Sequence, residues 1–238
     1  MQSINESYKN EKRMLAEACQ RCGELGYVTS SGGNISLRVD ENLILITPTK
    51  TPKRFMTEHD ICAIDLHGNT VYAPEGKKPT GETPFHARIM RMRPDIKSIV
   101  HAHPPVLTGF AIAHSDILSK AILPEPIIEI GPLLNVKYAT PLSEGLSENF
   151  DKVIRRSNAF LMENHGVLIC GGGDLLNTVE QLQMLEAMAQ SVTVAKTLGN
   201  VELLSNAELD ELQNVIKVRD LKIPGFKQNS LTDLYEEL

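Results

Sequence analysis

The order of apolar and polar residues divides the chain into helices and strands. From about Ser3 to Leu25, apolar residues recur with helical spacing on one stripe, and Gly26 follows as a helix stop. The later segments predicted to be helical are Thr83 to Arg93, Val106 to His114, Ser143 to Arg156, Asp174 to Leu198 and Asn206 to Val218. The tail from Pro224 to Leu238 is polar, and Phe226 and Tyr235 are its candidate anchors.

Short runs rich in β-branched residues, bounded by turn residues, predict strands. They are expected at Ile35 to Val39, Leu43 to Thr47, Asp60 to Leu66, Thr70 to Tyr72, Lys97 to His103, Ala159 to Met162 and Val167 to Cys170. A further short strand is expected between Pro124 and Pro132, and another at Val136 to Tyr138. No repeat or linker interrupts the pattern, so residues 1–238 are predicted to form a single α/β domain. Its mixed or antiparallel sheet should carry helices on both faces.

Composition and charge exclude several classes of protein. Of the 238 residues, 42% are hydrophobic and 23% are charged, and the net charge is −6. No basic stripe with interleaved aromatic residues is present, which argues against a nucleic-acid partner. The N-terminal segment lacks the apolar core of a secretory signal, and no run approaches the roughly 18 apolar residues that cross a bilayer. We therefore expect a cytoplasmic protein, and a small anionic ligand remains compatible with this charge.

The four cysteines are scattered along the chain. They are Cys19, Cys22, Cys62 and Cys170. Cys19 and Cys22 have the spacing of half a zinc site, but the chain has no second such pair. Both fall inside a predicted helix, where residues three apart share a face. We interpret all four as reduced core residues.

Two histidines close an apolar strand. His101 and His103 lie at i and i+2, and strand side chains alternate, so both point to the same face. His165 lies far downstream, between two further predicted strands. Three neutral imidazoles suit a divalent metal, above all zinc, and leave one coordination position open for a substrate. The HxH pair alone is a weak motif, because single histidines are often hydrogen-bonded core or surface residues.

Glu82 immediately precedes a predicted helix and has two interpretations. An acid in the first turn is commonly there because it interacts favourably with the helix dipole. A carboxyl group beside a metal could instead act as a general acid and base. His86, one helical turn after Glu82, could be a hydrogen-bond partner of the same site.

Two polar loops could bind an anion. The segment SSGGN, with Gly33 and Asn34, can turn successive backbone N–H groups toward one point, although it could equally be a flexible connection. The segment TPTKT, with Thr49 and Lys50, and the pair Thr80-Gly81 supply further donors.

These motifs together resemble the class II aldolase/adducin family, and their layout is similar to that of the L-fuculose-1-phosphate aldolases. The matching segments, in the order found in the family, are SGGNIS, ITPTKT, DICAIDLHGNTV, KPTGETPFH, IVHAHP and LMENHGVLICG. The resemblance covers residues from about 8 to 215 and leaves a tail at 219–238. It implies a single domain with a central, mostly antiparallel sheet flanked by helices. It also implies a homotetramer whose active sites lie at subunit interfaces.

The resemblance assigns roles to residues of this chain. His101, His103 and His165 would bind one Zn²⁺ per subunit. Glu82 would be the catalytic acid and base and would also ligate the resting metal. The residues implied for binding the substrate phosphate are Gly33, Asn34, Thr49, Lys50, Thr80 and Gly81.

Three departures from the aldolase pattern concern the substrate. Lys50 replaces the usual glycine of TPTG, and a cation there would suit a phosphate or a carboxylate. Thr80-Gly81 replaces a serine-containing pair, which removes one hydroxyl donor. The tyrosine that aldolases carry some twenty residues after HxH is missing, since Ile122 and its neighbours offer none. A C-terminal tyrosine also helps in those enzymes, and Tyr235 is the tail candidate.

The resemblance predicts a zinc-dependent aldolase. It would cleave a small phosphorylated ketose, such as L-fuculose 1-phosphate, to dihydroxyacetone phosphate and an aldehyde through a metal-stabilised enediolate. The alternative is a decarboxylase of a 3-oxo-tetronate 4-phosphate type of sugar acid, which Lys50 and the segment LGNVELLSNAELDEL would suit. A sugar-phosphate epimerase is less favoured, because related epimerases carry Asp where Glu82 stands. A dehydratase and a non-catalytic adducin-like module are the remaining options, and the intact histidines argue against the module.

Overall fold

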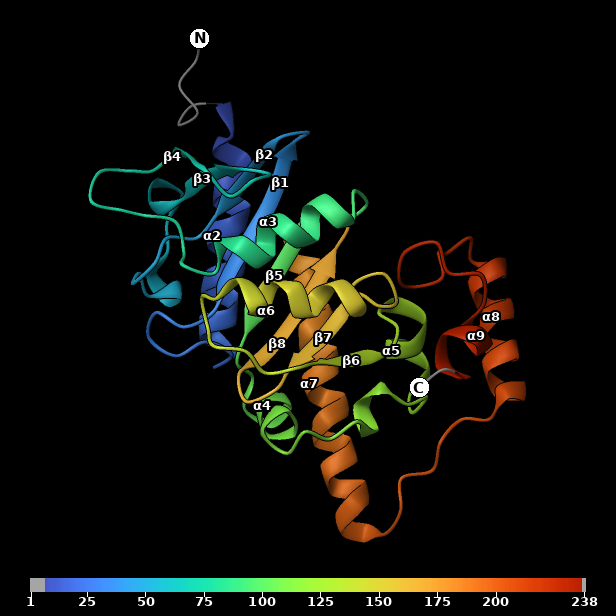
Figure 1. Cartoon of the computed structure of the whole chain (residues 1–238). Coiled ribbons are helices and arrows are strands. Elements are labelled where there is room, and N and C mark those ends of the chain that lie inside the picture. Colours follow the sequence, from blue (N-terminus) through green and yellow to red (C-terminus); the bar gives the residue numbers. More distant parts are fainter. Residues whose placement is uncertain (1–6, 237–238) are drawn as a thin grey trace.

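The computed structural model describes residues 7–236, so the predicted helix start at Ser3 lies outside the described residues. Within them, eight strands form one sheet in the order β4-β3-β2-β1-β5-β8-β7-β6 (Figure 1). The strands are β1 (Asn34–Asp40), β2 (Leu43–Ile46), β3 (Cys62–Asp65), β4 (Thr70–Tyr72), β5 (Ser98–Ala102), β6 (Leu133–Val136), β7 (Ala159–Met162) and β8 (Gly166–Gly171). Every neighbouring pair is antiparallel except β6 and β7, which are parallel. The predicted α/β domain with a mostly antiparallel sheet is confirmed.

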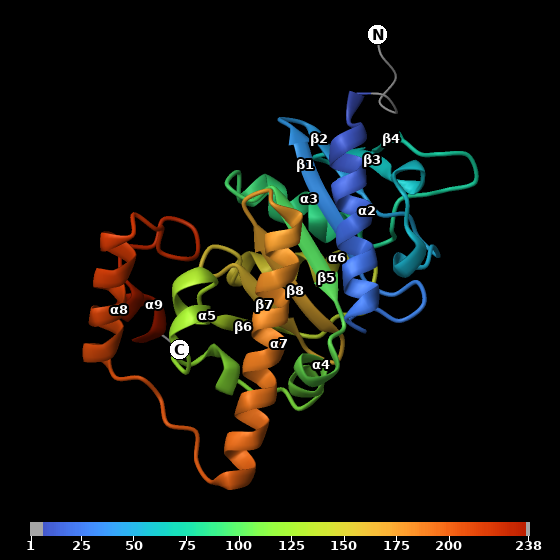
Figure 2. The same cartoon turned by 180° about the vertical axis from the view of Figure 1, so that it is seen from behind.

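Helices cover both faces of this sheet. They are α2 (Lys9–Glu24), α3 (Thr83–Met92), α4 (Pro105–Ile112), α5 (Pro124–Glu129), α6 (Glu144–Asn149), α7 (Leu175–Leu198), α8 (Asn206–Val218) and α9 (Leu231–Glu236). Two views from opposite sides show α2 and α7 on one face and α3 and α6 on the other (Figures 1 and 2). Helix α8 packs against α5 and against the short helix α9, and residues of all three share one apolar cluster near the edge strand β6.

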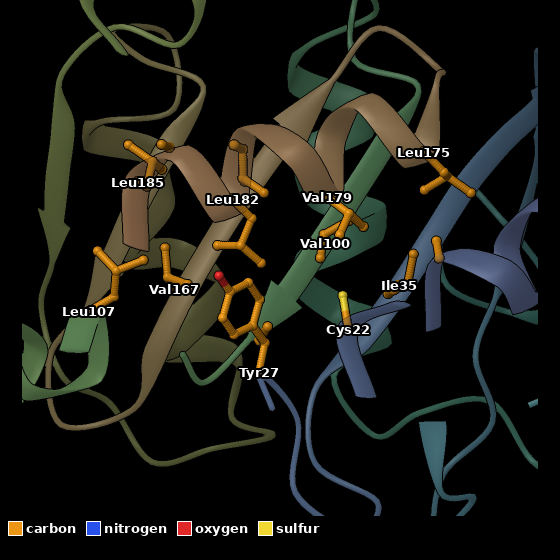
Figure 3. Close-up of a cluster of buried hydrophobic side chains, with 14 of the residues drawn as sticks. Cys22, Tyr27, Ile35, Val100, Leu107, Val167, Leu175, Val179, Leu182 and Leu185 are labelled. Carbon is orange, nitrogen blue, oxygen red and sulfur yellow. The ribbon is translucent and has the colours of Figure 1, made fainter. Parts of the chain in front are cut away.

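The two faces of the sheet make separate apolar cores. On the α7 face, Val179 and Leu182 pack over Val100 and Val167 of the strands (Figure 3). On the opposite face, Phe85 of α3 belongs to a second cluster with alternate residues of the same strands. Val100 therefore faces α7, whereas Ile99 faces α3, as strand alternation requires.

Two predictions about local structure were wrong. The stretch from Pro124 to Pro132 begins with helix α5 rather than a strand. Pro124 stands in the first turn, where a missing N–H costs nothing and the fixed φ suits a helix. The expected strand at Val136 to Tyr138 is β6 and lies earlier, at Leu133–Val136.

The predicted helix from Ser143 to Arg156 is much shorter than expected. Ser143 caps α6 by accepting a hydrogen bond from the Leu146 amide, as a helix start should. The α-helix ends at Asn149 and is followed by the 3₁₀ turn Phe150–Lys152. By contrast, α8 has the predicted bounds, and α7 starts one residue after Asp174, whose side chain caps it.

All four cysteines are buried and unpaired. Cys19 and Cys22 lie on the face of α2 that enters the core, where burial raises the pKa of the Cys22 thiol to about 12. Their interpretation as core residues is confirmed. Within residues 7–236, no helix combines the length and apolar character that a bilayer crossing needs.

Candidate metal centre

Three histidines from distant parts of the chain meet at one end of the sheet. His101 is the fourth residue of β5 and is fully buried, and His103 follows just beyond the strand. His165 lies in the turn between β7 and β8, where Asn164 has a positive φ of 54°. Pairing of β5 with β8 sets Ala102 opposite Val167 and so brings the turn against His103. One nitrogen from each ring lies within 4.8 Å of the other two.

The ring of His101 is held in one orientation. Its Nδ1 lies 2.9 Å from the carbonyl oxygen of Val167. A carbonyl can only accept a hydrogen bond, so Nδ1 carries the proton and Nε2 has a free lone pair. This arrangement is typical of metal-binding histidines, whose second nitrogen donates to a fixed acceptor.

The donor set fits a divalent metal. The Nε2 atoms of His101 and His103 are 3.2 Å apart, and two nitrogens bound to one tetrahedral zinc at about 2.0–2.1 Å lie roughly 3.3 Å apart. The Nε2 atom of His165 faces the same centre, where the carboxylate of Glu82 lies. Burial lowers the pKa of His103 to about 4, and it lowers that of His101 well below its usual range. Neutral imidazoles are the form that binds metals.

Glu82 completes the cluster from the start of α3. Its Oε2 lies 3.4 Å from Nε2 of His101, and its Oε1 lies 3.5 Å from Nε2 of His165. The side chain makes no capping hydrogen bond to α3 and is only 8% exposed. The carboxylate therefore faces the histidines, and this arrangement is more specific than that of an ordinary helix-start acid.

A chain of buried hydrogen bonds positions Glu82. The side-chain amide of Asn34 donates to Oε2 of Glu82 at 2.6 Å, so its oxygen faces Nε2 of His86 at 2.5 Å. That oxygen must accept, which places the His86 proton on Nε2 and leaves Nδ1 to accept from Ser36 Oγ at 2.7 Å. Burial lowers the pKa of His86 to about 3, so this ring is neutral. His86 thus acts on Glu82 through Asn34 and not by direct contact.

A cavity of about 220 Å³ opens beside the cluster. Glu82 and His103 lie in its wall, together with five residues implied for phosphate binding: Gly33, Asn34, Thr49, Thr80 and Gly81. Lys50, the sixth, is exposed and is not among the lining residues. The structure thus brings these five together with the histidines, and the phosphate-binding roles of all six stay predictions.

Two glycines allow the chain to approach the histidines closely. Gly33 has a φ of 67°, and a Cβ there would lie 2.7 Å from the carbonyl oxygen of His101. A Cβ on Gly166 would lie 2.4 Å from Cδ2 of His103. A side chain at Gly33 or Gly166 would therefore collide with His101 or His103, so both positions require glycine.

Lys53 also lines the cavity, and sequence reasoning missed it. It begins the 3₁₀ turn Lys53–Phe55 and is only 1% exposed. A lysine in a polar loop is normally exposed, so no local pattern marks this one. Tyr235 lies elsewhere, packed against the cluster of Leu209, Ile216 and Leu231 at the C-terminus. Its suggested role at the site stays a prediction.

Comparisons with known proteins agree with this geometry. A family model described as Class II Aldolase and Adducin N-terminal domain matches residues 13–193. A 3-oxo-tetronate 4-phosphate decarboxylase of Haemophilus influenzae is 28% identical over 207 residues, which cover 86% of this chain and 96% of that protein. An L-fuculose phosphate aldolase of Methanococcus maripaludis is 34% identical over 172 residues, covering 72% and 90%. The fold is similar to that of YgbL from Escherichia coli, with a TM-score of 0.80 and 22% identity over 87% of this chain and 100% of that one.

Proposed function

The chain belongs to the class II aldolase and adducin family, and we propose that it is a metal-dependent carbon–carbon lyase acting on a phosphorylated sugar or sugar acid. The observation that carries this proposal is the convergence of His101, His103 and His165 around the carboxylate of Glu82. Three neutral imidazoles with a carboxylate beside them are the groups that such a reaction needs.

The three histidines would hold the metal, which we propose to be zinc. A divalent ion bound there supplies a Lewis acid that stabilises the negative charge left on the substrate oxygens when a carbon–carbon bond breaks. The hydrogen bond to Val167 keeps His101 in the tautomer that can ligate. Burial of His101 and partial burial of His103 exclude water from one side of the centre.

Glu82 would move the proton. Breaking the bond leaves an electron pair on a substrate carbon, and a proton must reach that carbon to give the product. The carboxyl group of Glu82 faces the cavity beside His103 and is held there by Asn34. A positioned acid of this kind contributes typically about 10²–10⁴ to the rate.

Aldol cleavage is the first reaction we propose. In L-fuculose 1-phosphate the Glu82 carboxylate would take the C4 hydroxyl proton as the C3–C4 bond breaks to give an aldehyde, and it would then give that proton to C3 to form dihydroxyacetone phosphate. Support comes from the relative that is named an L-fuculose phosphate aldolase and is 34% identical.

Decarboxylation is the second candidate, and the groups that line the cavity of one chain suffice for it. Aldol cleavage requires Glu82 both to take the C4 hydroxyl proton and to protonate C3, whereas loss of CO₂ requires one proton donation only. Among the described residues that line the cavity, Glu82 is the one carboxylate, and there is no tyrosine. A 3-oxo-tetronate 4-phosphate would lose CO₂ and take a proton from Glu82 at the carbon that carried it. The relative named for that decarboxylation covers 86% of the chain.

The proposal also includes a cytoplasmic location and a homotetramer with active sites at subunit interfaces. A hollow of about 560 Å³ between α4 and α7 supports an interface there. It is lined by Val106, Gly109, Phe110, Ala113, Ser115, Thr193 and Lys196. Ile112 and Leu198 on the same helices are 60% and 84% exposed. Apolar surface of this kind commonly marks a protein contact.

Product analysis on zinc-loaded protein tests the reaction. Both substrates leave dihydroxyacetone phosphate, so the co-product must be measured. An aldehyde formed from L-fuculose 1-phosphate supports aldol cleavage, and CO₂ formed from 3-oxo-tetronate 4-phosphate supports decarboxylation. If neither co-product appears above the level given by chelator-treated protein, the lyase proposal is wrong.

A further inference from the structure

Lys53 places a positive charge inside the protein beside the metal centre. Its Nζ lies 3.1 Å from the carbonyl oxygen of Ser31 and 3.1 Å from that of Thr51. An ammonium group has three N–H donors, so these two carbonyls leave one donor unused. Among the described residues, no carboxylate lies within ion-pair distance of Lys53.

A buried ammonium without a counter-ion is costly, and most buried charges are paired. Lys53 lines the same cavity as Glu82 and His103 and stands beside the Gly32-Gly33 loop. Glu82 is engaged by Asn34 and faces the histidines. The cavity that Lys53 shares with the metal centre can therefore hold a bound anion that would balance the charge of Lys53.

Lys53 is also the single lysine or arginine among the described residues that line this cavity. The two neighbouring basic side chains, Lys50 and Arg54, are exposed. A phosphate group that enters the cavity would thus meet one fixed cation together with the hydroxyl-bearing Thr49 and Thr80. Hydrogen bonds from a charged donor to phosphate are about twice as strong as neutral ones.

We propose that Lys53 supplies the charge that binds the phosphate group of the substrate and so determines the specificity of this site for phosphorylated compounds. The inference rests on the proposed function insofar as it takes the substrate to be phosphorylated. It assigns the cation of the subsite to Lys53, whereas the sequence pattern alone points to Lys50.

The electrostatics of the loop are consistent with this role. Burial lowers the pKa of Lys53, and the negative charge of Glu82 opposes that effect. An anion in the cavity would also oppose the lowering of the Lys53 pKa, because a nearby opposite charge favours the ionised form. Binding of phosphate and protonation of Lys53 would then reinforce each other.

Titration of zinc-loaded protein with inorganic phosphate, followed by calorimetry, tests the proposal without requiring turnover. Two variants separate the charge of Lys53 from its structural hydrogen bonds. Lys53→Met removes both, whereas Lys53→Gln keeps N–H donors for the carbonyls of Ser31 and Thr51 and removes the charge. Arg54→Met is the control, because it removes an exposed charge from the same 3₁₀ turn.

We expect both Lys53 variants to bind phosphate about ten- to a hundredfold more weakly, with Arg54→Met within about twofold of the unaltered protein. Normal phosphate binding by Lys53→Gln would overturn the proposal, because Lys53 would then serve only to donate hydrogen bonds to the carbonyls of Ser31 and Thr51. Absence of phosphate binding by the unaltered protein would overturn it as well. So would a Lys53 dependence seen with acetate and not with phosphate. Each result is independent of the product analysis, so the inference and the proposed function can fail separately.

Discussion

Asn34 donates a hydrogen bond of 2.6 Å from its side-chain amide to Oε2 of Glu82. The two residues lie 48 positions apart in the chain and meet because the first residue of β1 lies beside the start of α3. The contact fixes which way the amide points, and it directs the carboxylate toward His101 and His165. It therefore links the hydrogen-bonded interior of the protein to its candidate metal centre.

Glu82→Gln tests the proton-transfer role. The amide keeps the shape of the side chain but cannot exchange a proton at neutral pH, so turnover should fall by about 10²–10⁴. Bound metal should remain, because the three histidines are unchanged. The measurement is kcat together with metal content, with the substrate identified by product analysis.

The matched control is Glu125→Gln, the same change at an exposed acid in the first turn of α5. It should leave kcat within about twofold, as surface changes usually do. Full activity of Glu82→Gln would remove this residue from the mechanism.

His86 is predicted to act as a positioning residue. In His86→Leu the oxygen of Asn34 loses its donor, so the amide can turn and weaken its hold on Glu82. We expect kcat to fall about tenfold while KM and metal content change little. His86→Gln can donate to Asn34 again and should recover most of the loss. Equal damage from both substitutions would indicate that His86 serves packing alone.

The free energy of unfolding should decrease as the pH falls, in part because of His86. Burial lowers the pKa of His86 to about 3 in the folded protein. In the unfolded chain the same imidazole has a pKa of about 6.5, so between these two values the unfolded chain binds a proton that the folded protein does not bind. The stabilising contribution is complete above pH 6.5 and is lost progressively as the pH falls from there toward 3. At pH 5 the loss from this one residue is about 2 kcal/mol.

The measurement is the free energy of unfolding of the metal-free protein by urea between pH 5 and pH 8. His86→Gln should show a shallower slope over that range than the unaltered protein. Parallel slopes would contradict a neutral, buried His86.

Gly166 is predicted to be required for metal binding. A Cβ at this position would lie 2.4 Å from Cδ2 of His103 and 2.6 Å from the carbonyl oxygen of Ala102, so Gly166→Ala must displace His103. We expect metal affinity to fall about ten- to a hundredfold, the size usual for disturbing a ligand's surroundings. Gly172→Ala is the control, because a Cβ there meets no atom within 4 Å. Equal metal affinity of the two variants would contradict the close approach of Gly166 to His103.

Much of the site was readable from the sequence because strand geometry is local. Alternation along a strand places His101 and His103 on one face, and the structure agrees. Their meeting with His165 depends on β5 pairing with β8, which is a long-range contact that no local pattern encodes. The family resemblance supplied that link instead, as it did for Glu82.

Other features could not be predicted, for physical reasons that differ. The burial of Lys53 depends on its contact with the loop that contains Ser31, and its polar sequence context does not encode this long-range contact. The strand expected after Pro124 is a helix, because proline is as suited to a first helical turn as to a loop. The helix from Ser143 ends at Asn149, yet Phe150 and Ile154 keep the i, i+4 spacing of one helix face and both enter the core. The apolar periodicity therefore could not show where this helix ends.

We propose that three histidines hold one divalent ion, and metal analysis of purified, zinc-reconstituted protein is the decisive measurement. We expect about one zinc ion per chain, and a loss of most of it in His103→Ala. His59→Ala is the control, since His59 is exposed and far from the cluster in the chain. It should keep the full content. A protein without bound divalent metal, or one whose metal content is the same in His103→Ala, would show that these histidines do not form a metal site.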